Sequence, residues 1–182
     1  WDLIRKMGKL LAIFIDCGDT LIDESTEIKT YDDISLKADL IPGASELLYE
    51  LKRRGYLLAL VADGPRLTFE NNLGVLLKLF DTCSISREIG YDKPHKSMFL
   101  SALNSLGIVN EEEYGNVVMI GNNLERDIKG ANDLGLISCW IDWAPRRDKI
   151  PKCKSEIPNY TIKNPLEFLD IIDEIEKNIP IQ

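Results

Sequence analysis

Apolar residues along the chain gather in short unbroken runs, and polar residues separate one run from the next. The first run ends at Ile15, and others follow at 56–62, 82–86, 116–120, 137–141 and 160–162. Continuous apolar runs of this length are typical of strands that are buried on both faces of a parallel sheet. We therefore predict six strands, most of them in the interior.

Between these runs, apolar residues recur at helical spacing. One helix opens after Pro42 and Gly43 and ends at Gly55, with Ala44, Leu47, Leu48 and Leu51 on one face. Others are expected at roughly 66–79, 96–106, 124–134 and 165–177. Strands that alternate with helices indicate an α/β fold with a doubly wound, Rossmann-like parallel sheet. Because no repeat or low-complexity region interrupts the pattern, we expect residues 1–182 to form a single domain.

Three stretches do not follow this alternation. Residues 23–41 are polar and acidic without a sustained period, so we expect a flap or loop with one short strand or helical turn at most. Residues 143–155 are rich in Pro and Lys and predict a second loop. Because Met7 would be a natural start just before the first strand, we interpret residues 1–8 as a leader.

Composition excludes several classes of protein. The chain has 182 residues, a net charge of −8 and 45% hydrophobic residues, which is ordinary for a globular domain. The acidic balance argues against a broad nucleic-acid-binding surface. No apolar run approaches the length of a membrane span, and no signal-peptide pattern is present. Four cysteines without a CxxC pair fit a reducing, cytoplasmic setting.

Polar residues stand where three of the predicted strands end. These groups are Asp16 to Thr20, Asp63-Gly64 and Asn122 to Asp127, and Lys93 lies in the loop after another strand. Turn formation and helix capping would explain each group singly. In a parallel sheet, however, all these ends lie along one edge, where ligands of open α/β sheets bind. Together the groups predict one polar site.

The same stretches resemble the motifs of the haloacid dehalogenase (HAD) superfamily of aspartate-nucleophile hydrolases. DCGDTL is similar to its first motif, LALVADG stands where its second motif ends a strand, Lys93-Pro94 is similar to its third, and GNNLERDIKGA to its fourth. The resemblance runs from Leu10 to the last helix, and the motifs occur in the family's order.

The resemblance implies a phosphohydrolase and assigns roles to particular residues. Asp16 would attack phosphorus and form an aspartyl-phosphate, and Lys93 would hold both Asp16 and the phosphate. The resemblance places a Mg²⁺ ion on Asp16, the backbone carbonyl of Gly18, Asn122 and Asp127. It places the bound phosphate beside Ala62, Asp63, Gly64 and Asn123.

The chain departs from the family pattern at three positions. Gly18 replaces the second Asp of the first motif, the general acid, and Asp19 one residue later is a candidate replacement. Ala62 replaces a hydroxyl residue of the second motif, and Asn122 replaces an acid of the fourth. General acid–base help is worth about 10²–10⁴ in rate, so slow turnover of alkyl phosphates is expected.

The intervals between the motifs are too short for the inserted cap domain by which most family members select substrate. A capless site should be open, which favours a large phosphorylated substrate or completion by a second subunit of a homo-oligomer. The three departures leave a catalytically weak or inactive HAD-fold binding or regulatory protein as an alternative. A dehalogenase-like hydrolase and an unrelated fold, such as a receiver domain or a dinucleotide binder, are further alternatives.

Overall fold

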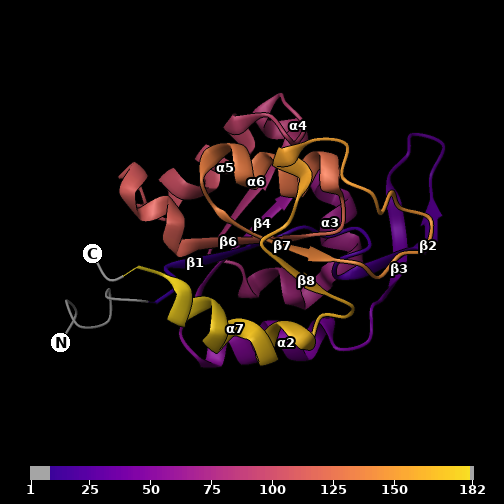
Figure 1. The fold of residues 1–182 in the computed structure, drawn as a ribbon. Coiled ribbons are helices and arrows are strands. Elements are labelled where there is room, and N and C mark those ends of the chain that lie inside the picture. Colours follow the sequence, from indigo (N-terminus) through magenta and orange to yellow (C-terminus); the bar gives the residue numbers. More distant parts are fainter. Residues whose placement is uncertain (1–8, 181–182) are drawn as a thin grey trace.

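The computed structural model describes residues 9–180, so the expected leader at 1–8 lies outside the described residues. Six parallel strands form one sheet in the order β5-β4-β1-β6-β7-β8 (Figure 1). The strands are β1 (Ala12–Ile15), β4 (Leu57–Ala62), β5 (Thr82–Ile85), β6 (Val117–Gly121), β7 (Ile137–Ile141) and β8 (Tyr160–Ile162). The predicted α/β doubly wound fold is confirmed.

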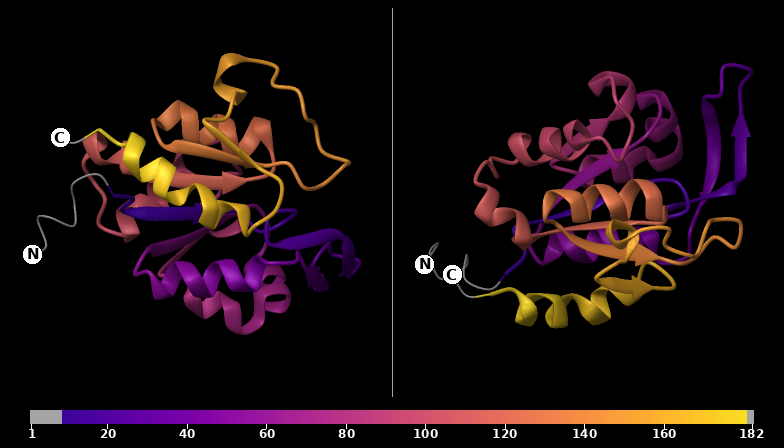
Figure 2. Two further views of the ribbon diagram at one scale, coloured as in Figure 1. Left: turned by 60° about the horizontal axis from the view of Figure 1, so that its bottom comes forward. Right: turned by 45° about the horizontal axis from the view of Figure 1, so that its top comes forward.

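Helices cover both faces of this sheet. The helices α2 (Ala44–Arg53) and α7 (Glu167–Asn178) lie below it in Figure 1, and α5 (Lys96–Ser105) and α6 (Lys129–Leu134) lie above it. Two further helices, α3 (Arg66–Leu73) and α4 (Ser86–Ile89), follow β4 and β5. Figure 2 shows the same layers from two other sides. No helix within residues 9–180 is long and apolar enough to cross a membrane.

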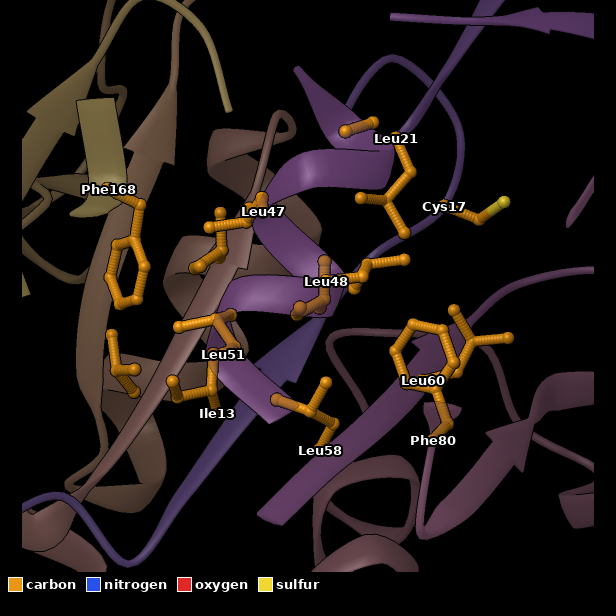
Figure 3. Packing of buried hydrophobic residues seen from close by; sticks show 14 of the residues in the cluster. Ile13, Cys17, Leu21, Leu47, Leu48, Leu51, Leu58, Leu60, Phe80 and Phe168 are labelled. Carbon is orange, nitrogen blue, oxygen red and sulfur yellow. The ribbon is translucent and has the colours of Figure 1, made fainter. Parts of the chain in front are cut away.

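Strand β1 shows how the sequence builds two cores. Ile13 and Ile15 face one way and join the cluster between the sheet and the helices α2 and α7. Figure 3 shows part of this cluster, with Leu47, Leu48 and Phe168. Ala12 and Phe14 face the other way and pack with α5 and α6. All four β1 side chains are fully buried because each face of the sheet has its own helical layer.

Two predicted helices are shorter or less regular than expected. The helix predicted at 66–79 ends at Leu73, because Gly74 has a φ of 52° and starts a 3₁₀ segment, η1 (Gly74–Leu79). The helix predicted at 124–134 begins with a π-helical turn, η3 (Leu124–Ile128), before α6. In that turn the Ile128 amide donates to the carbonyl of Asn123, five residues earlier.

The flap is more ordered than the sequence predicts. Residues 23–41 were expected to hold one short strand or helical turn at most, but β2 (Ile22–Lys29) and β3 (Ser35–Leu40) form an antiparallel hairpin. The hairpin stands beside the main sheet (Figure 1). Both of its faces are largely polar or exposed, which explains why no hydrophobic alternation marks it. Ser35 anchors it to α3 by accepting from Asn71 Nδ2 and donating its amide to Thr68 Oγ1.

Candidate active site

The ends of three neighbouring strands meet at one polar cavity of about 300 Å³. Its walls include the residues Asp16, Gly18, Asp63, Gly64, Lys93, Asn122, Asn123 and Asp127, all of them candidates from the sequence. Two further candidates, Asp19 and Ala62, are not among the wall residues. Ala62 is buried in the core cluster between the sheet and α2, and its methyl group packs with apolar neighbours.

At the buried end of the cavity, Lys93 joins the two carboxylates that the sequence singles out. Its Nζ lies 2.8 Å from Asp16 Oδ1 and 2.7 Å from Asp127 Oδ1. It also donates to the carbonyl oxygen of Val61 at 2.7 Å. The Lys93 side chain is 2% exposed, so these contacts are made away from bulk water. Three separate segments of the chain therefore meet at one ammonium group.

This trio holds two acidic groups and one basic group in a poorly hydrated place. Burial and the neighbouring Asp127 raise the pKa of Asp16 to about 6, although Lys93 opposes the change. Burial disfavours the Lys93 ammonium, but Asp127, Asp16 and Asp63 more than offset this and raise its pKa. When both carboxylates are ionised the trio carries one net negative charge, which attracts a cation.

The residues that follow β4 connect the trio to the rim of the cavity. Asp63 Oδ1 accepts from the backbone amide of Lys93 at 2.9 Å, which fixes the loop that carries Lys93. Asp63 Oδ2 lies 3.2 Å from Arg126 Nη1, and this guanidinium also borders the cavity. The Gly64 amide donates to Ser86 Oγ. Asp63 thus orders two basic residues, of which sequence reasoning missed Arg126.

The polar residues from Asn122 to Asp127 are positioned by the π-helical turn after β6. Asp127 Oδ2 accepts from the Asn123 amide at 3.0 Å, while Asn123 Oδ1 caps the turn by accepting from the Arg126 amide. Asn122 is 3% exposed, and its backbone oxygen accepts from Trp140 Nε1. The Asn122 Nδ2 atom has no hydrogen-bond partner among the described residues. A buried amide in this state indicates a polar group that is not part of the chain.

The donor atoms suit a hard divalent cation. Two carboxylates, the Asn122 amide and the Gly18 carbonyl offer oxygen ligands, the set that Mg²⁺ prefers. No cluster of three or more His, Cys, Asp or Glu side chains in a metal-binding arrangement is found within residues 9–180. A set of two carboxylates and two neutral oxygens therefore fits Mg²⁺. This set carries less negative charge than a set with three acidic residues would.

The loop after β1 folds back on itself and brings the hairpin to the cavity. The Asp19 amide donates to the carbonyl of Ile22, and the Asp19 side chain is fully buried. Its Oδ1 accepts from the Glu24 amide, and its Oδ2 lies 2.5 Å from Arg146 Nη2 and 3.0 Å from Arg147 Nε. These contacts place Asp19 beside the cavity wall and not in it. Asp19 therefore fastens the hairpin to the loop after β7.

Glu24 is an acidic residue of the hairpin that lies in the cavity wall, and sequence reasoning missed it. A β-carbon built on Gly18 would lie 1.7 Å from Glu24 Oε1, so the Glu24 carboxyl fills the space of the absent side chain. Glu24 Oε2 pairs with Arg147 Nη2 at 2.5 Å and with Arg146 Nη2 at 3.1 Å. Burial raises the pKa of Glu24 although Arg147 opposes it. No local sequence signal marks either contact, because both depend on the hairpin.

A doubly wound sheet with an Asp after its first strand, a buried Lys and a second Asp at one edge is the arrangement expected of a haloacid dehalogenase-like hydrolase. The model of the haloacid dehalogenase-like hydrolases matches residues 16–135, which span the three groups of polar residues and Lys93. The chain belongs to this family, and the predicted resemblance is confirmed.

Curated relatives of the chain include several proteins named as phosphatases. The glyceraldehyde 3-phosphate phosphatase of Methanopyrus kandleri is 32% identical over 143 residues, which are 77% of this chain and 58% of that protein. The phosphoserine phosphatase of Thermus thermophilus is 37% identical over 105 residues, 57% of this chain and 41% of that protein. The chain thus spans about half the length of these relatives.

A solved HAD phosphatase from Thermococcus onnurineus has the same fold. It superposes with a TM-score of 0.72 at 20% identity and covers 90% of this chain and 98% of its own. This likeness concerns the arrangement of strands and helices alone.

Proposed function

We propose that this protein is a Mg²⁺-dependent phosphohydrolase that works through an aspartyl-phosphate on Asp16. The observation that carries the proposal is the placement of Lys93, whose ammonium lies between Asp16 and Asp127 at the buried end of the cavity. A nucleophilic carboxylate can approach a phosphate only where positive charge offsets the repulsion between them. The names of the relatives support the same reaction class.

The two oxygens of Asp16 have different surroundings. Oδ1 is held by Lys93 at 2.8 Å, whereas the contact that Oδ2 accepts from Thr20 Oγ1 is longer, at 3.4 Å. Oδ2 is therefore the oxygen that attacks phosphorus. Its bond to phosphorus forms as the bond from phosphorus to the ester oxygen breaks, and the ester oxygen leaves with the electron pair and takes up a proton.

Hydrolysis of the intermediate returns Asp16 to its starting state. A water molecule attacks phosphorus, the bond from phosphorus to Asp16 Oδ2 breaks, and inorganic phosphate leaves. Lys93 stays paired with both carboxylates during these steps and faces the charge on the transferring group. The buried position of Lys93 makes this charge more effective than it would be in water.

We propose Asp16, Asp127, Asn122 and the carbonyl oxygen of Gly18 as the residues that would hold Mg²⁺. The ion would supply further positive charge for the phosphate and the leaving oxygen. The net negative charge of the trio supports this assignment.

The size of the cavity favours a small substrate. About 300 Å³ is at the lower end of the range for small-molecule sites, and the hairpin borders the cavity through Glu24 and Glu27. The sequence predicts an open site for a large substrate, but this chain's own hairpin encloses part of it. We therefore propose that the substrate is a small phosphate ester. The names of the relatives, which refer to glyceraldehyde 3-phosphate and phosphoserine, support this proposal. The expected homo-oligomer stays a prediction.

Phosphate release from a panel of small esters tests the proposal, with Mg²⁺ and with EDTA. We expect turnover in Mg²⁺, loss of turnover in EDTA, and loss in Asp16→Asn under both conditions. Mass spectrometry after acid quenching should find phosphate on the peptide that contains Asp16. Turnover that survives Asp16→Asn would refute the covalent step. No turnover with any ester would favour the alternative of a HAD-fold binding protein.

A further inference from the structure

We propose that Glu24, carried by the hairpin, provides the carboxyl group that faces the leaving oxygen. This inference rests on the proposed phosphohydrolase function. The attack by Asp16 expels an ester oxygen, and an alkoxide leaves well only when a positioned group gives it a proton. Gly18, two residues after Asp16, has no side chain for this task. An acidic residue of the cavity wall close to that position would therefore have to supply the proton.

The space beside Gly18 identifies Glu24. A β-carbon on Gly18 would lie 1.7 Å from Glu24 Oε1, 2.6 Å from Glu24 Cδ and 3.0 Å from Glu24 Cγ. The end of the Glu24 side chain thus occupies the volume that any side chain at position 18 would enter. It is also a wall residue of the cavity that contains Asp16 and Lys93. A carboxyl group stands at this place, and the first residues of the hairpin supply it.

The other acidic wall residues are committed elsewhere. Asp63 holds the Lys93 amide and Arg126, and Asp127 holds Lys93 and the Asn123 amide. Glu27 and Asp33 lie 3.4 Å and 3.0 Å from Lys29 Nζ, farther along the hairpin. Among the acidic wall residues that the structure describes, Glu24 is the one whose atoms lie nearest to the space at position 18.

The position of the Glu24 carboxyl is fixed by contacts on its far side. Glu24 Oε2 pairs with Arg147 and Arg146, while Oε1 is the atom nearest to Gly18. The Glu24 amide donates to Asp19 Oδ1, which ties the start of β2 to the loop that follows Asp16. One carboxyl oxygen is thus anchored and the other remains directed at the site, which positions the group for proton transfer.

The step balances as follows. The bond from Asp16 Oδ2 to phosphorus forms, the bond from phosphorus to the ester oxygen breaks, and the proton of the Glu24 carboxyl passes to that oxygen. The alcohol leaves, and Glu24 remains as a carboxylate. In the second step the attacking water gives one proton back to Glu24 as its oxygen bonds to phosphorus, and the bond from phosphorus to Asp16 Oδ2 breaks. Glu24 is then protonated again, and inorganic phosphate leaves.

The test compares two substrates and two matched variants. Glycerol phosphate has an alkoxide leaving group that depends on a proton, whereas 4-nitrophenyl phosphate has one that leaves largely unaided. We expect Glu24→Gln to lower kcat on glycerol phosphate by about 10²–10⁴-fold and on the nitrophenyl ester by less than about tenfold. The control Glu27→Gln removes a carboxylate from the same strand and cavity wall, and it should change both substrates alike.

A relocation of the carboxyl group provides a second test. Gly18→Asp alone should lower both activities, because its side chain would collide with Glu24. In the double variant Gly18→Asp/Glu24→Ala the space is free, and turnover of glycerol phosphate should exceed that of Glu24→Ala. A role of Glu24 in folding alone would predict no such recovery.

The outcomes separate this inference from the function on which it rests. A wild-type protein that hydrolyses neither ester overturns the proposed function and with it the role of Glu24. A wild-type protein that hydrolyses both, with the same ratio of rates in Glu24→Gln, overturns the role of Glu24 alone. Failure of the double variant to exceed Glu24→Ala also counts against it.

Discussion

Gly121 and Asp127 stand in a steric relationship that sets the geometry of the site. A β-carbon on Gly121 would lie 2.3 Å from Asp127 Cγ and 2.4 Å from Asp127 Oδ2. The Asp127 carboxylate therefore packs directly over the last residue of β6, where only glycine leaves room. This contact lets the Asp127 side chain turn back toward Lys93. Glycine is required at position 121 because it leaves space for Asp127, and not because of its backbone flexibility.

Gly121→Ala should displace Asp127 and weaken its contact with Lys93. We expect a loss of about 1–3 kcal/mol in the free energy of unfolding, as for other side chains forced into filled space, and loss of phosphatase activity. Urea denaturation and phosphate release measure the two effects. Gly115→Ala is the matched control, because a β-carbon there meets no atom within 4 Å. Equal stability of the two variants would show that Asp127 moves without cost.

Strand ends are the part of this site that sequence can predict. Buried strands are recognisable from their apolar runs, and a parallel topology forces Asp16, Asp127 and the Lys93 loop to one edge. The motif resemblance adds a role for each of these residues, and those roles stay predictions. The structure places Lys93 Nζ within 2.8 Å of both Asp16 and Asp127.

Contacts made by the hairpin could not be predicted in the same way. Its strands lack hydrophobic alternation, so neither their register nor the side of the cavity that Glu24 enters follows from the residues. The position of Asp19 could not be predicted either, but for a different reason. Its position in the motif implies a place in the site, but a positive φ of 51° and two arginines direct its carboxylate into the interior.

The raised pKa of Asp16 predicts how its replacement changes stability with pH in EDTA. The folded protein binds the Asp16 proton more tightly than the unfolded chain does, so stability falls as pH rises from about 4 to about 6. Above that window the ionised group costs up to about 3 kcal/mol, at 1.36 kcal/mol for each pKa unit. Asp16→Asn removes this cost. It should be more stable than wild type at pH 7 and not at pH 4.

Urea denaturation of both proteins at a series of pH values gives this difference directly. A difference that stays constant from pH 4 to pH 7 would contradict the prediction, because it would show that Asp16 does not titrate in that window. Added Mg²⁺ should reduce the difference at pH 7, since a bound cation stabilises the wild-type carboxylate.

Asn122→Asp should bind Mg²⁺ more tightly than the wild type. The substitution adds a carboxylate where the Asn122 amide has no partner within the described chain, beside a trio that already carries net negative charge. Without metal the variant should melt at a lower temperature, and with Mg²⁺ its melting temperature should rise further than that of wild type. Calorimetric titration and thermal melting check the two effects. Asn104→Asp, on the exposed face of α5, controls for the added charge.

Asp19→Asn distinguishes the residue that fastens the hairpin from the one that faces the leaving group. Asp19 is fully buried against Arg146 and Arg147, so loss of its charge should cost about 1–3 kcal/mol of folding stability. Because its carboxylate lies outside the cavity wall, the ratio of rates on alkyl and aryl phosphates should stay near that of wild type. Urea denaturation and the two-substrate assay measure these effects. A selective loss of alkyl phosphate turnover in Asp19→Asn, with that ratio unchanged in Glu24→Gln, would assign the proton to Asp19 instead.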